Sequence, residues 1–180
     1  MKRLFFFMGL VGIFSLIAGC GYTTSGALSP NHRTLFVKNF ENKVEFSENN
    51  NSAAYFPLLE VKAHDRIVDR FLFDGHLKIV PEESADLILT GTLRNYEKKP
   101  LRYTDNEDVQ EYRVYVTVDL KMVERETGTV VWDEPGFVGE GTYLLQGTVS
   151  SNVAGSEQGA VDLAVQDLAR RVVERTVEAW

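Results

Sequence analysis

The side chains best suited to catalysis or metal binding are scattered along this sequence of 180 residues. The histidines, His32, His64 and His76, lack the short spacings that are typical of metal sites. The serines have no nucleophile-elbow context, and no phosphate-cradling glycine loop opens a helix. The neighbouring acidic residues at 82–83 and 105–108 are typical of exposed loops. We therefore expect no enzyme, no metal site and no cofactor.

One group of basic residues has a spacing that suits anion binding. Arg94, Lys98, Lys99 and Arg102, called here the basic cluster, lie within nine positions of an acidic protein. Arginine and lysine side chains bind phosphate and carboxylate groups, so the cluster is a candidate contact for an anionic amphiphile. The alternative is structural, because lysines at the end of a strand keep a sheet edge from pairing with other chains. We expect Arg94, Tyr96 and Lys98 to share one face of a strand.

The single cysteine follows a segment with the composition of an export signal. Lys2 and Arg3 precede a stretch of 15 residues, Leu4 to Ala18, that is apolar apart from Ser15 and two glycines. A helix that spans a membrane needs roughly 20 residues, so this stretch suits the hydrophobic region of a signal peptide instead.

The signal ends in Leu16-Ile17-Ala18-Gly19-Cys20, which resembles the lipobox of bacterial lipoproteins. In that motif the cysteine sulfur receives a diacylglycerol, and cleavage then makes the cysteine the first residue. We predict a lipoprotein signal peptide over residues 1–19 and lipid attachment at Cys20. Two or three acyl chains, such as palmitate, bind a membrane firmly. Gly21 resembles the outer-membrane sorting pattern, and an ordinary cleavage site before a free or buried thiol is the alternative.

Composition limits the remaining classes of protein. Hydrophobic residues make up 44% of the chain and charged residues 25%, which is typical of a globular protein and allows one domain. The formal net charge of −7 argues against binding to nucleic acid. One cysteine forms no disulfide within the chain and no thiolate zinc site.

Hydrophobic periodicity predicts the elements of the domain. Residues 20–33, with Cys20 first, are small and polar and are expected to form a short tether, followed by a single domain over residues 34–180. A period near four predicts one helix over Phe56–Asp74 and another from Ser156 to the end. Alternation predicts strands, of which the longest is Glu111–Glu124. The other strands are expected at 34–40, 77–80, 86–96 and 130–132, with a possible extension over 137–145.

This order of elements predicts an α+β fold, in which two helices pack on one face of a mostly antiparallel sheet of about four strands. The other face of the sheet is polar and is either solvated or a surface for a partner. We expect it to carry two sets of residues: Arg113, Tyr115, Thr117 and Asp119 on the longest strand, and Thr90, Thr92, Arg94 and Tyr96 on its neighbour.

Several short segments, taken in order, resemble the LptE family of lipopolysaccharide-assembly lipoproteins. They are Gly19-Cys20-Gly21-Tyr22, Phe36-Val37-Lys38-Asn39-Phe40-Glu41-Asn42, Ala85-Asp86-Leu87-Ile88-Leu89-Thr90-Gly91-Thr92-Leu93, Glu111-Tyr112-Arg113-Val114 and Thr127-Gly128-Thr129-Val130-Val131-Trp132. The resemblance implies a non-catalytic domain that plugs the outer-membrane β-barrel LptD and contacts lipopolysaccharide on its way to the cell surface. It makes the basic cluster a candidate for that contact.

A second interpretation is a lipoprotein that regulates a periplasmic enzyme or a secretion complex, similar to LpoB or CsgG. Regulators of the LpoB type carry a long linker across the periplasm. Here only 13 residues separate Cys20 from Thr34. At no more than about 3.6 Å per residue, such a tether keeps the domain near its membrane, which favours the plug.

Overall fold

The computed structural model describes residues 32–44, 56–145 and 153–177. The predicted signal peptide, Cys20 and most of the tether lie outside these residues. The elements are β1 (Thr34–Val37), β2 (Glu41–Asn42), α2 (Leu59–Asp74), β3 (Lys78–Ile79), the 3-10 helix η1 (Glu82–Ser84), β4 (Leu87–Tyr103), β5 (Val109–Glu124), β6 (Val130–Leu144), β7 (Val153–Ala154) and α3 (Glu157–Val177).

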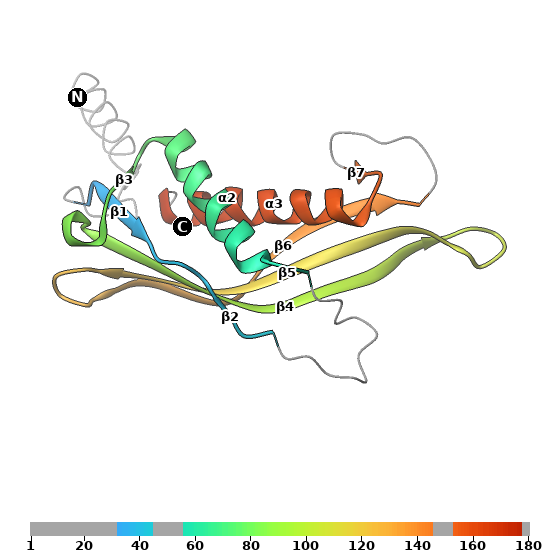
Figure 1. The fold of residues 1–180 in the computed structure, drawn as a ribbon, viewed down its shortest axis with the longest axis horizontal. Coiled ribbons are helices and arrows are strands. Elements are labelled where there is room, and N and C mark those ends of the chain that lie inside the picture. Colours follow the sequence, from blue (N-terminus) through green and yellow to red (C-terminus); the bar gives the residue numbers. More distant parts are fainter. Residues whose placement is uncertain (1–31, 45–55, 146–152, 178–180) are drawn as a thin grey trace, which may run out of the picture.

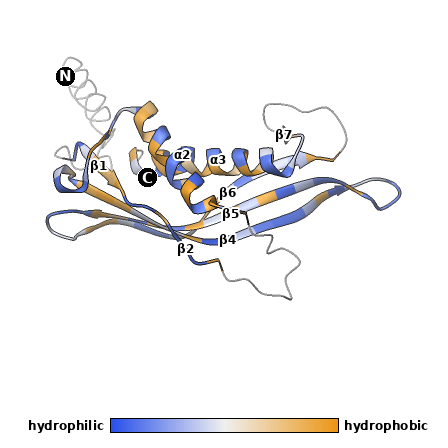
Figure 2. Ribbon diagram, in the orientation of Figure 1, coloured by the Kyte–Doolittle hydropathy of each residue, from blue (hydrophilic) through white to orange (hydrophobic). Residues whose placement is uncertain are grey.

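Two helices cover one face of the sheet, and the core lies between the two layers (Figure 1). The predicted stripe of α2 is buried at Leu59, Ala63, Ile67 and Phe71. Helix α3 buries nine residues, which is a wider stripe than that of α2, and it packs on β5, β6 and α2. Figure 2 shows hydrophobic residues where the helices meet the sheet and hydrophilic residues towards the tip of the β4–β5 hairpin.

The predicted α+β class is confirmed, but the prediction of about four mostly antiparallel strands is wrong. Among the described residues the sheet has seven strands, in the order β3-β1-β4-β5-β6-β7, with β2 beside β4. It is mixed, because β1 pairs in parallel with β3 and β4, β2 with β4, and β6 with β7. Helix α2 lies between β1 and β3 in the sequence and returns the chain to the end of the sheet where β1 begins. Strand β3 therefore runs parallel to β1. Strands β2 and β7 have only two residues each, too few to show a period.

Three long antiparallel strands, β4, β5 and β6, form the centre of the sheet. The prediction ended the first of them at Tyr96, whereas β4 continues through Pro100 to Tyr103. Strands β1 and β2 pair with β4 only as far as Leu93, so Pro100 lies where β4 has no second neighbour among the residues that the structure describes. A proline is tolerated there because no ladder partner requires its missing N–H.

Two glycines and a serine form helix ends and a turn of the fold. Gly75 ends α2 at a φ of 78°, and its N–H donates to the carbonyl oxygen of Phe71 at 3.0 Å. Gly128 in the β5–β6 turn has a φ of 71°. The Ser156 hydroxyl accepts the N–H of Gly159 at 3.2 Å and caps α3. Helix α2 begins at Leu59, three residues later than predicted, and α3 is described only as far as Val177.

Candidate functional site

The basic cluster does not form one surface. A register shift in the pairing of β4 with β5 lies between Leu93 and Asn95, so Arg94 is an extra residue in the alternation. Tyr96 is 3% exposed and faces the helices, whereas the Arg94 side chain is 48% exposed. The prediction that Arg94, Tyr96 and Lys98 share one face is therefore wrong, and so is the placement of Tyr96 on the polar face. A bulge reverses the direction of every later side chain, and periodicity alone does not reveal it.

Arg94 forms an ion pair across two strands. Its Nε donates to Oδ2 of Asp119 on β5 at 2.5 Å. The other oxygen of Asp119 accepts the N–H of Gly136 on β6 at 2.8 Å. The Gly136 hydrogen bond is the largest cause of a lowered pKa at Asp119, burial opposes it, and Arg94 adds to it. The carboxylate of Asp119 on β5 thus contacts both neighbouring strands: β4 through Arg94 and β6 through Gly136.

Glu157, at the start of α3, binds three side chains of the sheet. Its carboxylate accepts the Tyr96 hydroxyl at 2.6 Å, the Lys98 ammonium at 2.7 Å and the Tyr143 hydroxyl at 3.5 Å. Burial works against the charge on Glu157, but the hydrogen bonds from Lys98 and Tyr96 hold its pKa below the ordinary value of 4.5. Burial raises the pKa of Tyr96 well above 10.0, and the hydrogen bond to Glu157 adds to this rise. This group anchors α3 to the sheet.

The two remaining cluster residues also have acidic partners. Lys99 pairs with Glu97 at 2.9 Å and lies 5.5 Å from the centre of the Tyr115 ring. Arg102 stands 3.5 Å from a carboxylate oxygen of Glu111. All four cluster residues are thus paired with carboxylates, which reduces the charge that each offers to an external anion.

A groove of about 770 Å³ lies beside the helices, away from the basic cluster. Four arginines and three carboxylates line it, so it has one excess positive charge. The lining comes from three places: Arg66, Asp69, Arg70 and Phe73 on α2; Leu163, Gln166, Asp167, Ala169 and Arg170 on α3; and Arg113, Glu140, Gly141 and Thr142 on β5 and β6. On each helix the lining residues recur every three or four positions, which places them on one side of that helix.

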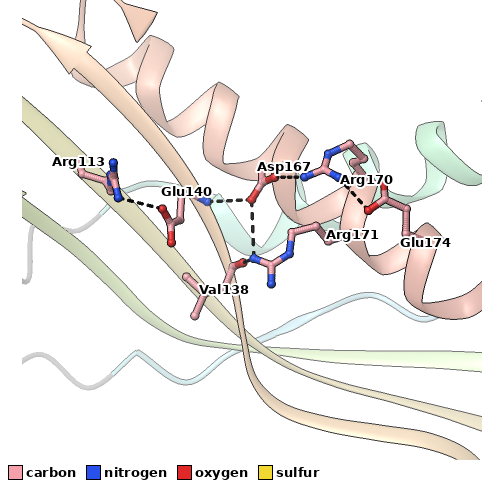
Figure 3. A network of polar contacts seen from close by, with 7 residues as sticks. All are labelled: Arg113, Val138, Glu140, Asp167, Arg170, Arg171 and Glu174. Atoms are coloured by element: carbon pink, nitrogen blue, oxygen red, sulfur yellow. Dashed lines mark hydrogen bonds and ion pairs between the residues drawn. The ribbon is translucent and has the colours of Figure 1, made fainter. Parts of the chain in front are cut away.

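A network of polar contacts fixes the α3 side of this groove (Figure 3). Asp167 accepts from Arg170 at 2.6 Å and from the backbone N–H of Glu140 at 3.3 Å. The Glu140 carboxylate in turn accepts from Arg113 at 3.3 Å. Arg171 donates to the carbonyl oxygen of Val138 at 2.5 Å, so side chains of α3 satisfy backbone groups along β6.

The α2 side of the groove differs in how its arginines are paired. Within the described segments, no carboxylate oxygen lies within 4.0 Å of a guanidinium nitrogen of Arg66 or Arg70. Asp74, four residues after Arg70, hydrogen-bonds His76 at 2.7 Å instead. The sequence places both arginines on the polar side of a helix among acidic residues, a pattern that usually indicates surface ion pairs. No sequence signal therefore separates them from ordinary solvated charges.

The three histidines have separate neighbours. His32 hydrogen-bonds Glu124 at 3.0 Å, His64 hydrogen-bonds Asp65 at 2.9 Å, and His76 contacts Asp74. Over residues 32–44, 56–145 and 153–177 no three side chains of His, Cys, Asp or Glu are close enough together to hold a metal ion. In the same segments neither helix has the length and apolar character that crossing a membrane requires.

Several solved structures are similar to this chain at low sequence identity. Protein CT253 from Chlamydia trachomatis is 12% identical, with a TM-score of 0.50 over 80% of this chain and 95% of that one. PelC from Paraburkholderia phytofirmans is 17% identical, with a TM-score of 0.49 over 87% and 96%. Lipoprotein B from Nitrosomonas europaea is 12% identical, with a TM-score of 0.47 over 81% and 83%. At 12% identity, the similarity to CT253 shows the fold alone.

A search of curated proteins finds no match. The sequence model of one family does match, over residues 33–176, which is most of the chain. That family is described as lipopolysaccharide-assembly, and its match covers β1, the long strands and nearly all of α3. The resemblance noted in the sequence is thereby confirmed, and the chain belongs to the LptE family of lipopolysaccharide assembly.

Proposed function

We propose that this chain is an outer-membrane lipoprotein that binds the β-barrel protein LptD, plugs its lumen and assists the transport of lipopolysaccharide to the cell surface. Acyl chains on Cys20 hold the domain on the periplasmic side of the membrane. The protein acts by binding and not by turnover. The observation that carries the proposal is the family match over residues 33–176.

The face of the sheet opposite the helices supports this proposal. It carries Thr90, Thr92, Tyr115, Thr117 and Asp119, as the alternation of buried and partly exposed residues along β4 and β5 shows. The lumen of an outer-membrane barrel is lined by polar residues. A sheet face with hydroxyl groups and internally paired charges matches such a wall without leaving an isolated charge in it.

A short tether supports the same location. The 13 residues between Cys20 and Thr34 reach less than about 50 Å even when fully extended. Anchoring beside the barrel raises the effective concentration of the domain there, so moderate affinity is enough for stable occupancy.

Purification of the full chain from membranes in a mild detergent tests the proposal. We expect a large β-barrel protein and lipopolysaccharide to be recovered with the wild-type chain. Thr117→Arg, which adds a long charged side chain to the polar sheet face, should reduce recovery of the barrel. Ser84→Arg adds the same side chain in η1, away from that face, and serves as the control.

Two results would contradict the proposal. Recovery of a peptidoglycan synthase or a secretion complex without a barrel would favour the regulatory lipoprotein. Equal recovery of the barrel with Thr117→Arg and with wild type would show that the polar sheet face does not contact it.

A further inference from the structure

We propose that the outward side of α2 docks an acidic, partly apolar segment of the barrel protein. The docking surface consists of three exposed apolar residues, Leu58, Val61 and Leu72, called here the α2 ridge, and of the neighbouring arginines Arg66 and Arg70. The inference rests on the proposed function, because it assigns a second contact to the same partner. It concerns the helical layer, on the side of the sheet opposite the polar sheet face.

The first argument is that α2 is apolar on two sides. One side is the buried stripe that packs in the core. Val61 and Leu72 lie about three turns apart at 3.6 residues per turn, so they share a second side, which points away from that stripe. Val61 is 46% exposed and Leu72 is 60% exposed. An amphipathic helix normally has polar residues there, so apolar residues in this position indicate a partner.

Exposed apolar residues are also concentrated at this helix. Of the eight large hydrophobic residues that are exposed in the described segments, four lie within residues 58–73. The fourth of them, after the three residues of the α2 ridge, is Phe73, which is 81% exposed. Single exposed apolar residues need no explanation, whereas a group on one element is typical of an interaction surface.

The second argument is the conformation of Leu58. It is the N-cap residue of α2, with a φ of 57° and a ψ of 31°, and it is 62% exposed. This left-handed conformation is unfavourable for a residue with a Cβ atom, and leucine has no polar side-chain group that could cap the helix. Neither burial nor helix capping therefore explains a leucine at this position, whereas contact of its side chain with a partner does.

The third argument is the charge beside the α2 ridge. Arg66, Arg70 and Phe73 line the groove on the side of α2 next to α3. In the part of the chain that the structure describes, neither arginine belongs to an ion pair. The Nε of Arg70 is buried and has no hydrogen-bond partner there, and its guanidinium lies 5.4 Å from the centre of the Phe73 ring. A carboxylate of the partner satisfies this donor with a charge-assisted hydrogen bond.

The charges of α2 favour a protein segment over a membrane surface. A helix that lies in a membrane interface is rich in lysine and arginine on its polar side. Helix α2 has three basic and four acidic residues, so anionic lipid gains little from it. The lumen wall of a barrel is polar and does not match an apolar ridge. The occupant is therefore a segment outside the wall, with apolar side chains for the α2 ridge and a carboxylate for the arginines.

Recovery of the barrel protein with the full chain, purified from membranes in a mild detergent, tests the α2 ridge. Val61→Ser with Leu72→Ser should lower recovery of the barrel at least threefold. Val130→Ser with Leu145→Ser is the matched control, because these residues are of the same types, are 48% and 55% exposed, and lie outside α2. Recovery with the control should stay within a factor of 1.5 of wild type.

Charge reversal tests the arginines in the same assay. Arg66→Glu with Arg70→Glu should also lower recovery of the barrel at least threefold. Lys38→Glu with Lys78→Glu makes the same change of charge at two exposed lysines outside α2 and should leave recovery unchanged. Thermal unfolding checks that every variant is folded.

Leu58→Gly separates docking from folding. Glycine adopts the left-handed conformation without strain, so the unfolding temperature should equal or exceed that of wild type. Loss of the leucine side chain should still reduce recovery of the barrel at least twofold. A lower unfolding temperature together with full recovery would assign Leu58 to the fold and overturn its part in docking.

Photo-crosslinking identifies the occupant. Benzoylphenylalanine in place of Leu72 should crosslink, in intact membranes, to one segment of the barrel protein that contains an aspartate or a glutamate. The same group in place of Ser84 in η1 is the control and should not reach that segment. Exchange of the acidic residue for arginine should restore recovery of the barrel with Arg66→Glu and Arg70→Glu.

Other outcomes overturn the inference. Full recovery of the barrel with both the ridge variant and the arginine variant removes the docking surface and leaves the proposed function in place. A crosslink to lipid or to a second copy of the chain assigns the α2 ridge to that occupant instead. Failure of the exchanged charge to restore recovery removes the carboxylate contact. Absence of the barrel from the wild-type preparation contradicts the inference and the proposed function together.

Discussion

Gly141 of β6 lies directly against the backbone of Ala164 in α3. A Cβ atom placed on Gly141 would lie 2.8 Å from the amide nitrogen of Ala164, closer than real Cβ contacts. Gly139, two residues earlier on β6, is packed in the same way. A Cβ atom placed on it would lie 3.0 Å from the amide nitrogen of Leu168. The two glycines therefore let the helix rest on the strand without a side chain between them, and they place α3 at the groove.

We expect Gly141→Ala to destabilise the protein, because the added methyl group meets helix backbone and not a flexible side chain. Overpacking of this kind costs about 1 to 3 kcal/mol. Urea denaturation measures the change in the free energy of unfolding. Asn95→Ala, at an exposed position of β4, is the control and should stay within about 0.5 kcal/mol. Equal stability of Gly141→Ala and wild type would show that α3 moves away from β6 without cost.

Tyr96→Phe tests the anchoring of α3 to the sheet through Glu157. The substitution keeps the buried ring and removes the hydroxyl that donates to Glu157 at 2.6 Å. A hydrogen bond to a charged group contributes about 1.5 to 3 kcal/mol, so we expect a loss at the lower end of this range because Lys98 still pairs with the carboxylate.

The matched variant is Tyr115→Phe. Tyr115 lies on the opposite face of the sheet, next to Lys99, and a phenylalanine keeps the ring that Lys99 contacts. Its free energy of unfolding should stay within about 0.5 kcal/mol of wild type. A similar loss in both variants would mean that the Tyr96 hydroxyl has no special role.

The hydrogen bonds that Asp86 accepts predict that the fold becomes less stable at acid pH. Its carboxylate accepts the N–H groups of Arg33 and Thr34, each at 2.9 Å. The hydrogen bond from Arg33 is the largest cause that holds the pKa of Asp86 below its ordinary value of 3.8. Because the folded pKa is the lower one, the stabilisation is complete above about pH 4 and is lost as the pH falls through the folded value.

Asp86→Asn should therefore be less stable than wild type at neutral pH, and this difference should shrink in acid. Denaturation series at pH values between about 6 and 2 measure the difference in the free energy of unfolding. A difference that stays constant over this range would mean that the charge of Asp86 does not stabilise the fold.

The strengths and failures of the sequence-based prediction have physical causes. The helices were predictable because Leu59, Ala63, Ile67 and Phe71 repeat at a helical period and Gly75 permits a left-handed end. The face of β5 was predictable because its alternation is uninterrupted from Tyr112 to Met122. The bulge at Arg94 was not, because an inserted residue changes no composition and its position depends on pairing with another strand.

The groove illustrates the same limit for the candidate site. Arg66 and Arg70 lie about one hundred residues from Arg170 in sequence, and only the packing of α2 on α3 brings them together. Whether an arginine is paired also depends on which carboxylates fold close to it. The order of the short segments was enough to indicate the family. The spacing of basic residues, however, indicated the basic cluster as the site, and its charges are paired within the protein.

Cys20 provides the last prediction, which concerns the anchor. We expect intact-mass spectrometry of the membrane-extracted chain to find an N-terminus at Cys20 that carries a diacylglycerol and a further acyl chain. A chain with Cys20→Ala behind an ordinary cleavable signal should appear in the soluble periplasmic fraction, because two or three acyl chains supply most of the membrane affinity. Gly21→Asp keeps the lipid and should shift the chain from the outer to the inner membrane. An unmodified Cys20 in the membrane-bound wild type would contradict the lipid anchor, whereas the groove and the polar sheet face would remain as the fold places them.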